Sequence, residues 1–334
     1  MSLALSGQSS QAYLQDTRND NVQVYVNGEF VHRDRATVSV FDSGYVCGDG
    51  VWEGLRLVNG KLIALQAHLD RLFAGAAAIQ LNIGHSPEEL TDIMYNTLKI
   101  NGMTDGAHLR LMITRGKKRT PNQDPRFILG GATIVCVAEY KVVDEQAKRR
   151  GLALFTSTYR TSAPDVFDLR LNSHSRLNLI QALLQALDAG ADEALMLDPH
   201  GFVASCNSTN FFIIRQGELW TSNGLYCFNG ITRRTILSLA RQQGLGVQER
   251  SFTLAEAFTA DEAFVTGTLA GITPVSRLDG RRFDLNENPV TQRISGWYQD
   301  YLQQEESPPA DNRWTKKNRR DSAGRFKCKS IDCK

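Results

Sequence analysis

Three short stretches combine residue types that could hold an anion. Gly230-Ile231-Thr232 opens a predicted helix, where free N–H groups, a hydroxyl and the helix dipole favour negative charge. Thr266-Gly267-Thr268 follows a predicted strand and makes a second turn rich in hydroxyl groups. Arg71 lies on the polar side of a predicted amphipathic helix. Helix capping, turn formation and a solvated arginine would explain these features equally well, so each one has a structural interpretation beside the functional one.

A glycine-rich stretch, Gly48-Asp49-Gly50-Val51-Trp52-Glu53-Gly54, comes close to the dinucleotide-binding fingerprint. Its third glycine falls one position late, and no strand–turn–helix unit follows it. The favoured interpretation is a tight turn that leads into a hairpin.

The elements that would position these residues begin with an α+β domain over residues 22–145. Asn27-Gly28 and Asn59-Gly60 predict two hairpins, because Asn-Gly suits a type I′ turn. The alternation and periodicity of apolar residues predict strands over 38–41, 106–114 and 132–140, and helices over 67–81 and 87–101. Residues 1–21 show no useful periodicity and are predicted to be a flexible arm.

A larger domain is predicted over residues 151–304. It contains a helix with one apolar stripe, made of Leu177, Ile180, Leu183, Leu184 and Leu187. Two strands, 193–198 and 210–214, are expected to form a hairpin around the turn at Pro199-His200-Gly201. The last predicted helix covers 289–304, and residues 305–334 have the composition of a disordered tail.

Composition narrows the class of protein. The chain has 334 residues, 42% of them hydrophobic and 22% charged, which is typical of a globular protein with two domains. No run approaches eighteen apolar residues, so no membrane span is expected. Six scattered cysteines and a polar N-terminus without signal-peptide order favour the cytoplasm.

The net charge of +2 conceals an uneven distribution. Nine Lys and Arg against two Asp and Glu give the segment 313–334 a charge of +7, so residues 1–312 carry −5. The basic tail is the one segment that could bind nucleic acid through its phosphates. A basic run of this kind is usually solvated, so nucleic-acid binding is not expected.

Seven motifs in order resemble the class IV, fold-type IV aminotransferases, the branched-chain and D-amino-acid transaminase family. They are VYVNGEFV, FDSGYVCGDGVWEGLRL, HLDRL, LRLMITRG, GFVASCNSTNFFI, GITRRTIL and DEAFVTGTLAGITPV, over about residues 22–302. The resemblance implies an α+β fold with a small N-terminal α/β domain and a larger C-terminal domain. It also implies pyridoxal 5′-phosphate (PLP) between the domains, a homodimer, and amino-group transfer between an amino acid, such as a branched-chain one, and a 2-oxo acid.

The same resemblance assigns roles to individual residues. Arg71, Ile231, Thr232, Gly267 and Thr268 match the positions that hold the cofactor phosphate. Trp52 matches an aromatic position beside the substrate, and Arg110 lies on a strand that often contributes to recognition of the substrate carboxylate.

Two positions depart from the family pattern. Asn172 stands where the family has the lysine that forms the Schiff base with PLP, and no lysine occurs between Lys148 and Lys316. Nearby His174 could move a proton but could not hold a stable internal imine. Ser205 stands where the family has a carboxylate that keeps the pyridine nitrogen protonated, and a serine brings no charge.

Three interpretations of these departures remain open at this point. The chain could retain PLP-dependent amino-group transfer with an unusual lysine. It could be a pseudoenzyme whose pocket still binds PLP without a covalent bond, or another phosphate-bearing ligand. It could also carry out a different acid–base reaction that uses His174 and the neighbouring hydroxyl groups.

Overall fold

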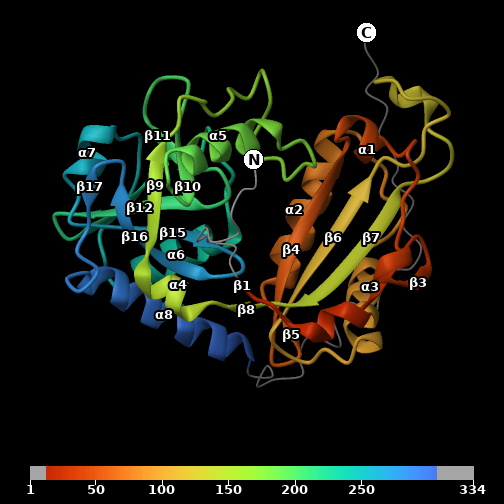
Figure 1. Cartoon of the computed structure of the whole chain (residues 1–334), viewed down its shortest axis with the longest axis horizontal. Coiled ribbons are helices and arrows are strands. Elements are labelled where there is room, and N and C mark those ends of the chain that lie inside the picture. Colours follow the sequence, from red (N-terminus) through yellow and green to blue (C-terminus); the bar gives the residue numbers. More distant parts are fainter. Residues whose placement is uncertain (1–12, 307–334) are drawn as a thin grey trace, which may run out of the picture.

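The computed structural model describes residues 13–306, which form two domains side by side (Figure 1). The N-terminal domain contains a six-stranded antiparallel sheet in the order β3-β2-β7-β6-β4-β5. Its strands are β2 (Gln23–Val26), β3 (Glu29–His32), β4 (Gly50–Val58), β5 (Lys61–Leu62), β6 (Ala107–Thr114) and β7 (Thr133–Tyr140). Its helices are α1 (Ser43–Cys47), α2 (Leu65–Ala78) and α3 (Pro87–Ile100), with 3-10 turns at Thr17–Asn21, Arg33–Arg35 and Pro125–Phe127.

Strand alternation directs some side chains of this sheet away from the core. Leu109, Leu111 and Ile113 of β6 are fully buried in the core that the sheet forms with α2 and α3. Successive side chains of a strand point to opposite faces, so His108 and Arg110 lie on the other face, which borders a cavity. The period-2 pattern of β6 thus presents a basic residue to that cavity.

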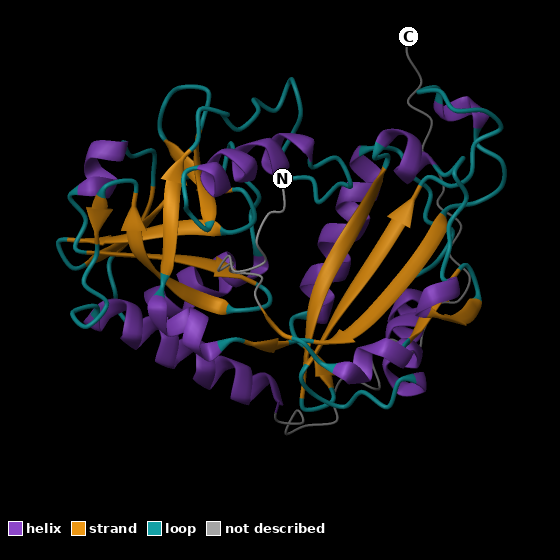
Figure 2. Ribbon diagram, viewed as in Figure 1, coloured by secondary structure: helices purple, strands orange, loops and turns teal. Residues whose placement is uncertain are grey.

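A nine-stranded mixed sheet forms the centre of the C-terminal domain, with helices on both sides (Figure 2). The strand order is β11-β10-β9-β16-β15-β12-β13-β14, and β17 pairs with β16. The strands are β9 (Leu152–Thr156), β10 (Glu193–Leu197), β11 (Val203–Cys206), β12 (Asn210–Arg215), β13 (Glu218–Thr221), β14 (Val247–Glu249), β15 (Glu262–Gly267), β16 (Gly271–Leu278) and β17 (Arg281–Arg282). The helices are α5 (Leu177–Asp188), α6 (Ile231–Gln242), α7 (Leu254–Phe258) and α8 (Pro289–Glu306), and α4 (Glu145–Arg150), which precedes β9 in the sequence, contacts β16.

The helix predicted from the apolar stripe is present as α5, but most of that stripe does not face the core. Leu177, Ile180 and Leu184 are 69%, 49% and 46% exposed. The buried side chains of α5 are instead Ala182 and Ala186, which pack against β10. Small side chains allow the helix to lie close to the sheet, which leaves the larger leucines on the outer face.

Several other predictions need correction. The arm predicted over residues 1–21 is structured from Tyr13, because β1 (Tyr13–Leu14) pairs with β8 (Val142–Val143) and a 3-10 turn follows. The strand predicted at 38–41 is absent, and this segment is a loop that leads into α1. The hairpin partner of β10 is β11, which was not predicted, rather than the strand at 210–214.

The C-terminal boundary also differs slightly from the prediction. Helix α8 continues to Glu306, so the predicted tail at 305–334 overlaps the helix by two residues. The rest of that tail, with its basic residues, lies outside the described residues. Within residues 13–306 no helix is both long and apolar enough to cross a bilayer.

Candidate functional site

A cavity of about 430 Å³ receives residues from both domains. All ten residues that the sequence singled out line this cavity, namely Trp52, Arg71, Arg110, Asn172, His174, Ser205, Ile231, Thr232, Gly267 and Thr268. They come from strands, helix starts and loops that lie far apart in the sequence. The fold therefore gathers the isolated motifs in one place, although proximity alone assigns no role to any of them.

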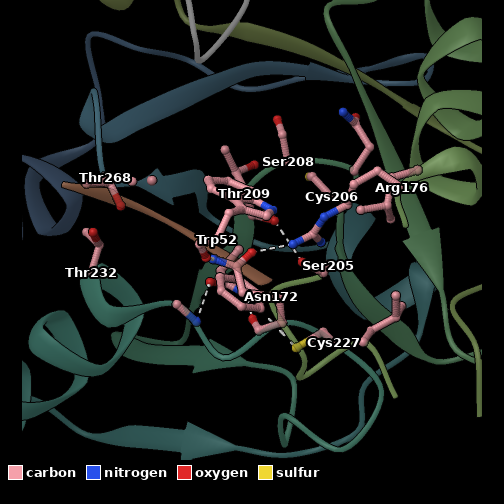
Figure 3. Close-up of a pocket in the computed structure, with 18 of the residues that line it drawn as sticks. Trp52, Asn172, Arg176, Ser205, Cys206, Ser208, Thr209, Cys227, Thr232 and Thr268 are labelled. Carbon is pink, nitrogen blue, oxygen red and sulfur yellow. Dashed lines mark hydrogen bonds between the residues drawn. The ribbon is translucent and has the colours of Figure 1, made fainter. Parts of the chain in front are cut away.

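One end of the cavity contains groups that could bind an anion. Gly230 caps α6 without a side chain, so the backbone N–H groups at the start of this helix remain open to a ligand. A β-carbon on Gly230 would overlap Asn210 Oδ1, which explains the glycine. Thr232 and Thr268 lie near each other at this end of the cavity (Figure 3). Two hydroxyl groups and a helix N-terminus make a suitable phosphate site.

Arg71 reaches the same cavity from α2 and is held by a buried carboxylate. Its Nε and Nη2 donate to Glu53 Oε1 and Oε2 at 2.8 and 2.6 Å, and His68 Nδ1 donates to Glu53 Oε2 at 2.6 Å. Burial raises the pKa of Glu53, but the hydrogen bonds from Arg71 and His68 outweigh burial and leave that pKa below its usual value. Arg71 is thereby fixed in orientation while its Nη1 faces the Asn229 carbonyl at 3.3 Å.

The segment that carries Asn172 is attached to the N-terminal sheet by backbone hydrogen bonds. Trp52 N donates to Asn172 O at 2.9 Å, and His174 N donates to Gly50 O at 3.0 Å. A β-carbon on Gly50 would overlap the Ile113 carbonyl and the ring of His174. The glycine-rich stretch predicted as a turn before a hairpin is therefore largely strand β4, and its glycine permits this close approach.

The side chain of Asn172 is fully engaged. Its Nδ2 donates to Trp52 O at 2.5 Å, and its Oδ1 accepts a hydrogen bond from Arg176 Nη2. Only 4% of Asn172 is exposed. Among the described residues, no lysine lines the cavity. An amine able to form a Schiff base is thus not found among the described residues that line the cavity, whereas Thr232, Thr268 and the start of α6 are groups that could hold a phosphate.

Ser205 faces the cavity with a hydroxyl that already has an acceptor. Its Oγ donates to Thr209 O at 2.7 Å, and Thr209 Oγ1 donates in turn to Glu193 Oε2 at 2.7 Å. The serine oxygen can therefore only accept a further hydrogen bond. A ligand nitrogen placed against Ser205 would need to carry its own hydrogen, and no carboxylate side chain among the described residues lines the cavity to hold that proton there.

Two residues of the site were not singled out from the sequence. Arg176 and His108 both line the cavity. Arg176 follows Asn172 by four positions at the start of a helix, and His108 precedes Arg110 by two on one strand, so both spacings carried a usable signal. Among the described residues, no group of three His, Cys, Asp or Glu side chains is placed to hold a metal ion.

Three buried or half-buried histidines predict how stability depends on pH. Burial lowers the pKa of His68, of His174 and of His108, the last to about 3 with further contributions from Lys141 and Arg110. Because the unfolded chain binds these protons near pH 6.5 and the folded chain does not, stability is retained above that pH. It should fall below about pH 6.5, and His108 alone should contribute about 1.4 kcal/mol per pH unit between that pH and its folded value of about 3.

Urea denaturation at pH 8, 6.5 and 5 would measure this dependence. His108→Gln, which has no titrating group, should give a shallower loss of unfolding free energy between pH 6.5 and 5. An unfolding free energy that rises between pH 6.5 and 5 in the unchanged protein would contradict the neutral state of these rings in the folded protein.

Comparison with known proteins assigns the family. Residues 50–278 match the family described as Amino-transferase class IV. Branched-chain-amino-acid aminotransferase-like protein 2 of Arabidopsis thaliana is 39% identical over 283 residues, which is 84% of this chain and 50% of that protein. This chain thus spans about half the length of that relative. The same holds for branched-chain-amino-acid aminotransferase-like protein 1 of Arabidopsis thaliana, which is 38% identical. The putative branched-chain-amino-acid aminotransferase of Methanocaldococcus jannaschii is 37% identical over 84% of this chain and 96% of its own.

Solved structures agree with this assignment. A branched-chain amino acid aminotransferase from T.th., complexed with N-(5′-phosphopyridoxyl)-L-glutamate, gives a TM-score of 0.78 at 28% identity, covering 86% of this chain and 96% of that one. The same aminotransferase has been solved with pyridoxamine 5′-phosphate, at a TM-score of 0.77 and 28% identity over 84% of this chain and 94% of that one. Since the family match covers more than half of the sequence, this chain has fold type IV and belongs to the class IV, PLP-dependent aminotransferase family.

Proposed function

We propose that this chain binds PLP, or a closely similar phosphate-bearing ligand, in the cavity between its domains without forming a Schiff base. The observation that carries the proposal is the environment of Asn172, whose amide is bonded to Trp52 and Arg176 in a cavity that no described lysine lines. The phosphate end, with Thr232, Thr268 and the start of α6, retains its anion-binding groups. When PLP is bound covalently to a lysine it acts as an electron sink for amino-group transfer. Asn172 offers no amine for that attachment.

The position of each residue in the cavity suggests its role in binding the ligand. Thr232, Gly267, Thr268 and the Ile231 N–H would hold the phosphate, and Arg71 would contribute its remaining guanidinium donors. Trp52 would lie against the ligand, and Arg110 would face a carboxylate. Asn172 and Ser205 would occupy the positions of the two replaced catalytic groups.

Borohydride reduction tests this proposal directly. Purified protein would be titrated with PLP, reduced, and analysed by intact mass and peptide mapping, with pyridoxine 5′-phosphate as a competitor that cannot form an imine. Saturable, competable binding without a fixed mass increase is the expected result, and Thr232→Val with Thr268→Val should weaken it. A competable adduct mapped to one lysine would overturn the proposal, as would the absence of any binding.

Amino-group transfer on a branched-chain substrate is the second candidate. One observation favours it, namely an apolar wall of the cavity suited to an aliphatic side chain, formed by Met112, Leu169, Leu179 and Leu183. It requires an amine donated by a lysine outside the described lining, so the adduct in the reduction experiment would support this candidate and exclude the first.

We also propose that the chain forms a homodimer in the cytoplasm. Leu177, Ile180 and Leu184 make an exposed apolar face on α5, and Tyr45 of α1 is 75% exposed. Such a patch on a protein surface commonly marks a contact with another chain. The four cysteines among the described residues are free thiols, which suits a reducing compartment.

A charge on α5 is expected to separate the subunits. Leu177→Glu combined with Leu184→Glu should convert a dimer to a monomer in light scattering after gel filtration, because burying two carboxylates in an apolar contact is costly. Ile100→Glu, at an equally exposed site on α3, is the matched control and should stay dimeric. A dimer that survives the α5 changes would place the interface elsewhere.

A further inference from the structure

The cavity carries an unusual balance of charge. Three arginines, Arg71, Arg110 and Arg176, line it, and among the described residues no Asp, Glu or Lys does so. Glu53 lies behind the lining and neutralises Arg71. Arg110 and Arg176 form no ion pair with the described part of the chain and instead lie over the ring of Trp52, at 4.2 and 5.4 Å. Both guanidinium groups are therefore available to pair with an anion of a ligand.

Arg176 is the less solvated of these two groups. Its Nε has no hydrogen-bond partner within the described residues, and its one hydrogen bond goes to the neutral amide oxygen of Asn172. Burial, together with Arg110 and Arg71, lowers the pKa of Arg176 to about 10. A half-buried guanidinium whose Nε is fully buried is costly without a carboxylate partner, and a ligand could supply one.

The position of Arg176 relative to Thr232 and Thr268 indicates which chemical groups the ligand would carry. Figure 3 shows Thr232 and Thr268 on one side of the cavity, Arg176 on the other, and Trp52 with Asn172 between them. Asn172 stands where a lysine would take the aldehyde of PLP, and Arg176 is bonded directly to this asparagine. A ligand whose phosphate lies at Thr232 and Thr268 would therefore place the substituent that corresponds to the PLP aldehyde near Arg176.

Resting on the proposed non-covalent pocket, we propose that Arg176 anchors a carboxylate carried by a small phosphate monoester, so that an ion pair replaces the covalent bond. The preferred ligand then has a phosphate at the start of α6 and a carboxylate at the position of the PLP aldehyde. A planar guanidinium with unused N–H donors matches a carboxylate in shape as well as in charge. Arg110, which also lies over the ring of Trp52, adds a second positive charge to the lining of the cavity.

Three probes that differ at one substituent test this inference. They are PLP with its aldehyde, pyridoxine 5′-phosphate with an alcohol, and the 5′-phosphate of 4-pyridoxic acid with a carboxylate. Calorimetric titration should give the carboxylate probe an affinity about ten-fold or more above the alcohol, since a charge-assisted hydrogen bond is added. Neither of these two probes can form an imine, so lysines elsewhere do not affect the comparison.

Substitutions identify the group responsible. Arg176→Met should abolish the preference for the carboxylate while the alcohol still binds, and Arg176→Lys should retain part of it. Arg215→Met, which removes another guanidinium that lies over a tryptophan but outside the cavity, is the matched control and should change nothing. Equal affinity for the carboxylate and alcohol probes would overturn the role of Arg176 while leaving the pocket intact. If no probe binds, the non-covalent pocket itself is wrong.

Discussion

Asn172→Lys is expected to produce a protein that PLP labels irreversibly at residue 172 on borohydride reduction. The position is buried, lines the cavity and lies between Trp52 and Arg176, so an amine placed there has a fixed approach to a ligand bound at the start of α6. Burial and the charge of Arg176 would lower the pKa of the new lysine. A larger share of it would then be the neutral, nucleophilic form.

Intact mass, peptide mapping and visible absorbance would measure this gain. Asn172→Met is the matched control, because it fills the same space without an amine. Adding Ser205→Glu should supply the missing carboxylate, so amino-group transfer is expected in the double variant rather than in either single one. If the introduced lysine remained unlabelled in a variant that still binds pyridoxine 5′-phosphate, residue 172 would not occupy the position of the catalytic lysine.

Glu53→Gln is expected to lower the free energy of unfolding by about 3–5 kcal/mol, because removing its charge leaves the guanidinium of Arg71 without a counter-ion in a partly buried site. Glu53 is 1% exposed and accepts hydrogen bonds from Arg71 and His68. Removing one partner is the costly way to break such an ion pair. The same change should weaken phosphate binding, since Arg71 would lose the orientation that Glu53 imposes.

Urea denaturation at pH 7 would measure the loss. Arg126→Gln, which breaks an ion pair whose arginine is 87% exposed, serves as the control and should change stability by less than about 1 kcal/mol. The lowered pKa of Glu53 means that its contribution is present above about pH 4.3, the unfolded-chain value, and is lost as pH falls through the folded value. A Glu53→Gln effect as small as the control would show that the cluster contributes little.

Local signals predicted the elements of this fold more successfully than its tertiary contacts. The Asn27-Gly28 and Asn59-Gly60 turns are present, with all four residues at positive φ, because few residues other than Asn and Gly tolerate that conformation. The stripe on α5 predicted the helix but not its buried face, because an exposed apolar face and a buried face of alanines both recur at helical spacing. Hydrophobicity alone does not say which of two apolar faces is covered by the sheet.

In the candidate site, too, local features could be predicted from the sequence and tertiary contacts could not. Helix starts and hydroxyl-rich turns are local features, so Thr232 and Thr268 could be found from the sequence. The bonds of Glu53 to His68 and Arg71 depend on how α2 packs on β4, and the engagement of Asn172 depends on two segments about 120 positions apart. No pattern within either segment indicates its partner.

The short pairing between β4, at residues 50–52, and the 172–174 segment joins the two domains by backbone hydrogen bonds beside the cavity. Neither domain can separate from the other without breaking these bonds and exposing the buried Asn172. The domains should consequently unfold in one cooperative step. Amide hydrogens of Trp52 and His174 should exchange with solvent only as slowly as those of the central strands, and a bound ligand should slow all of them together.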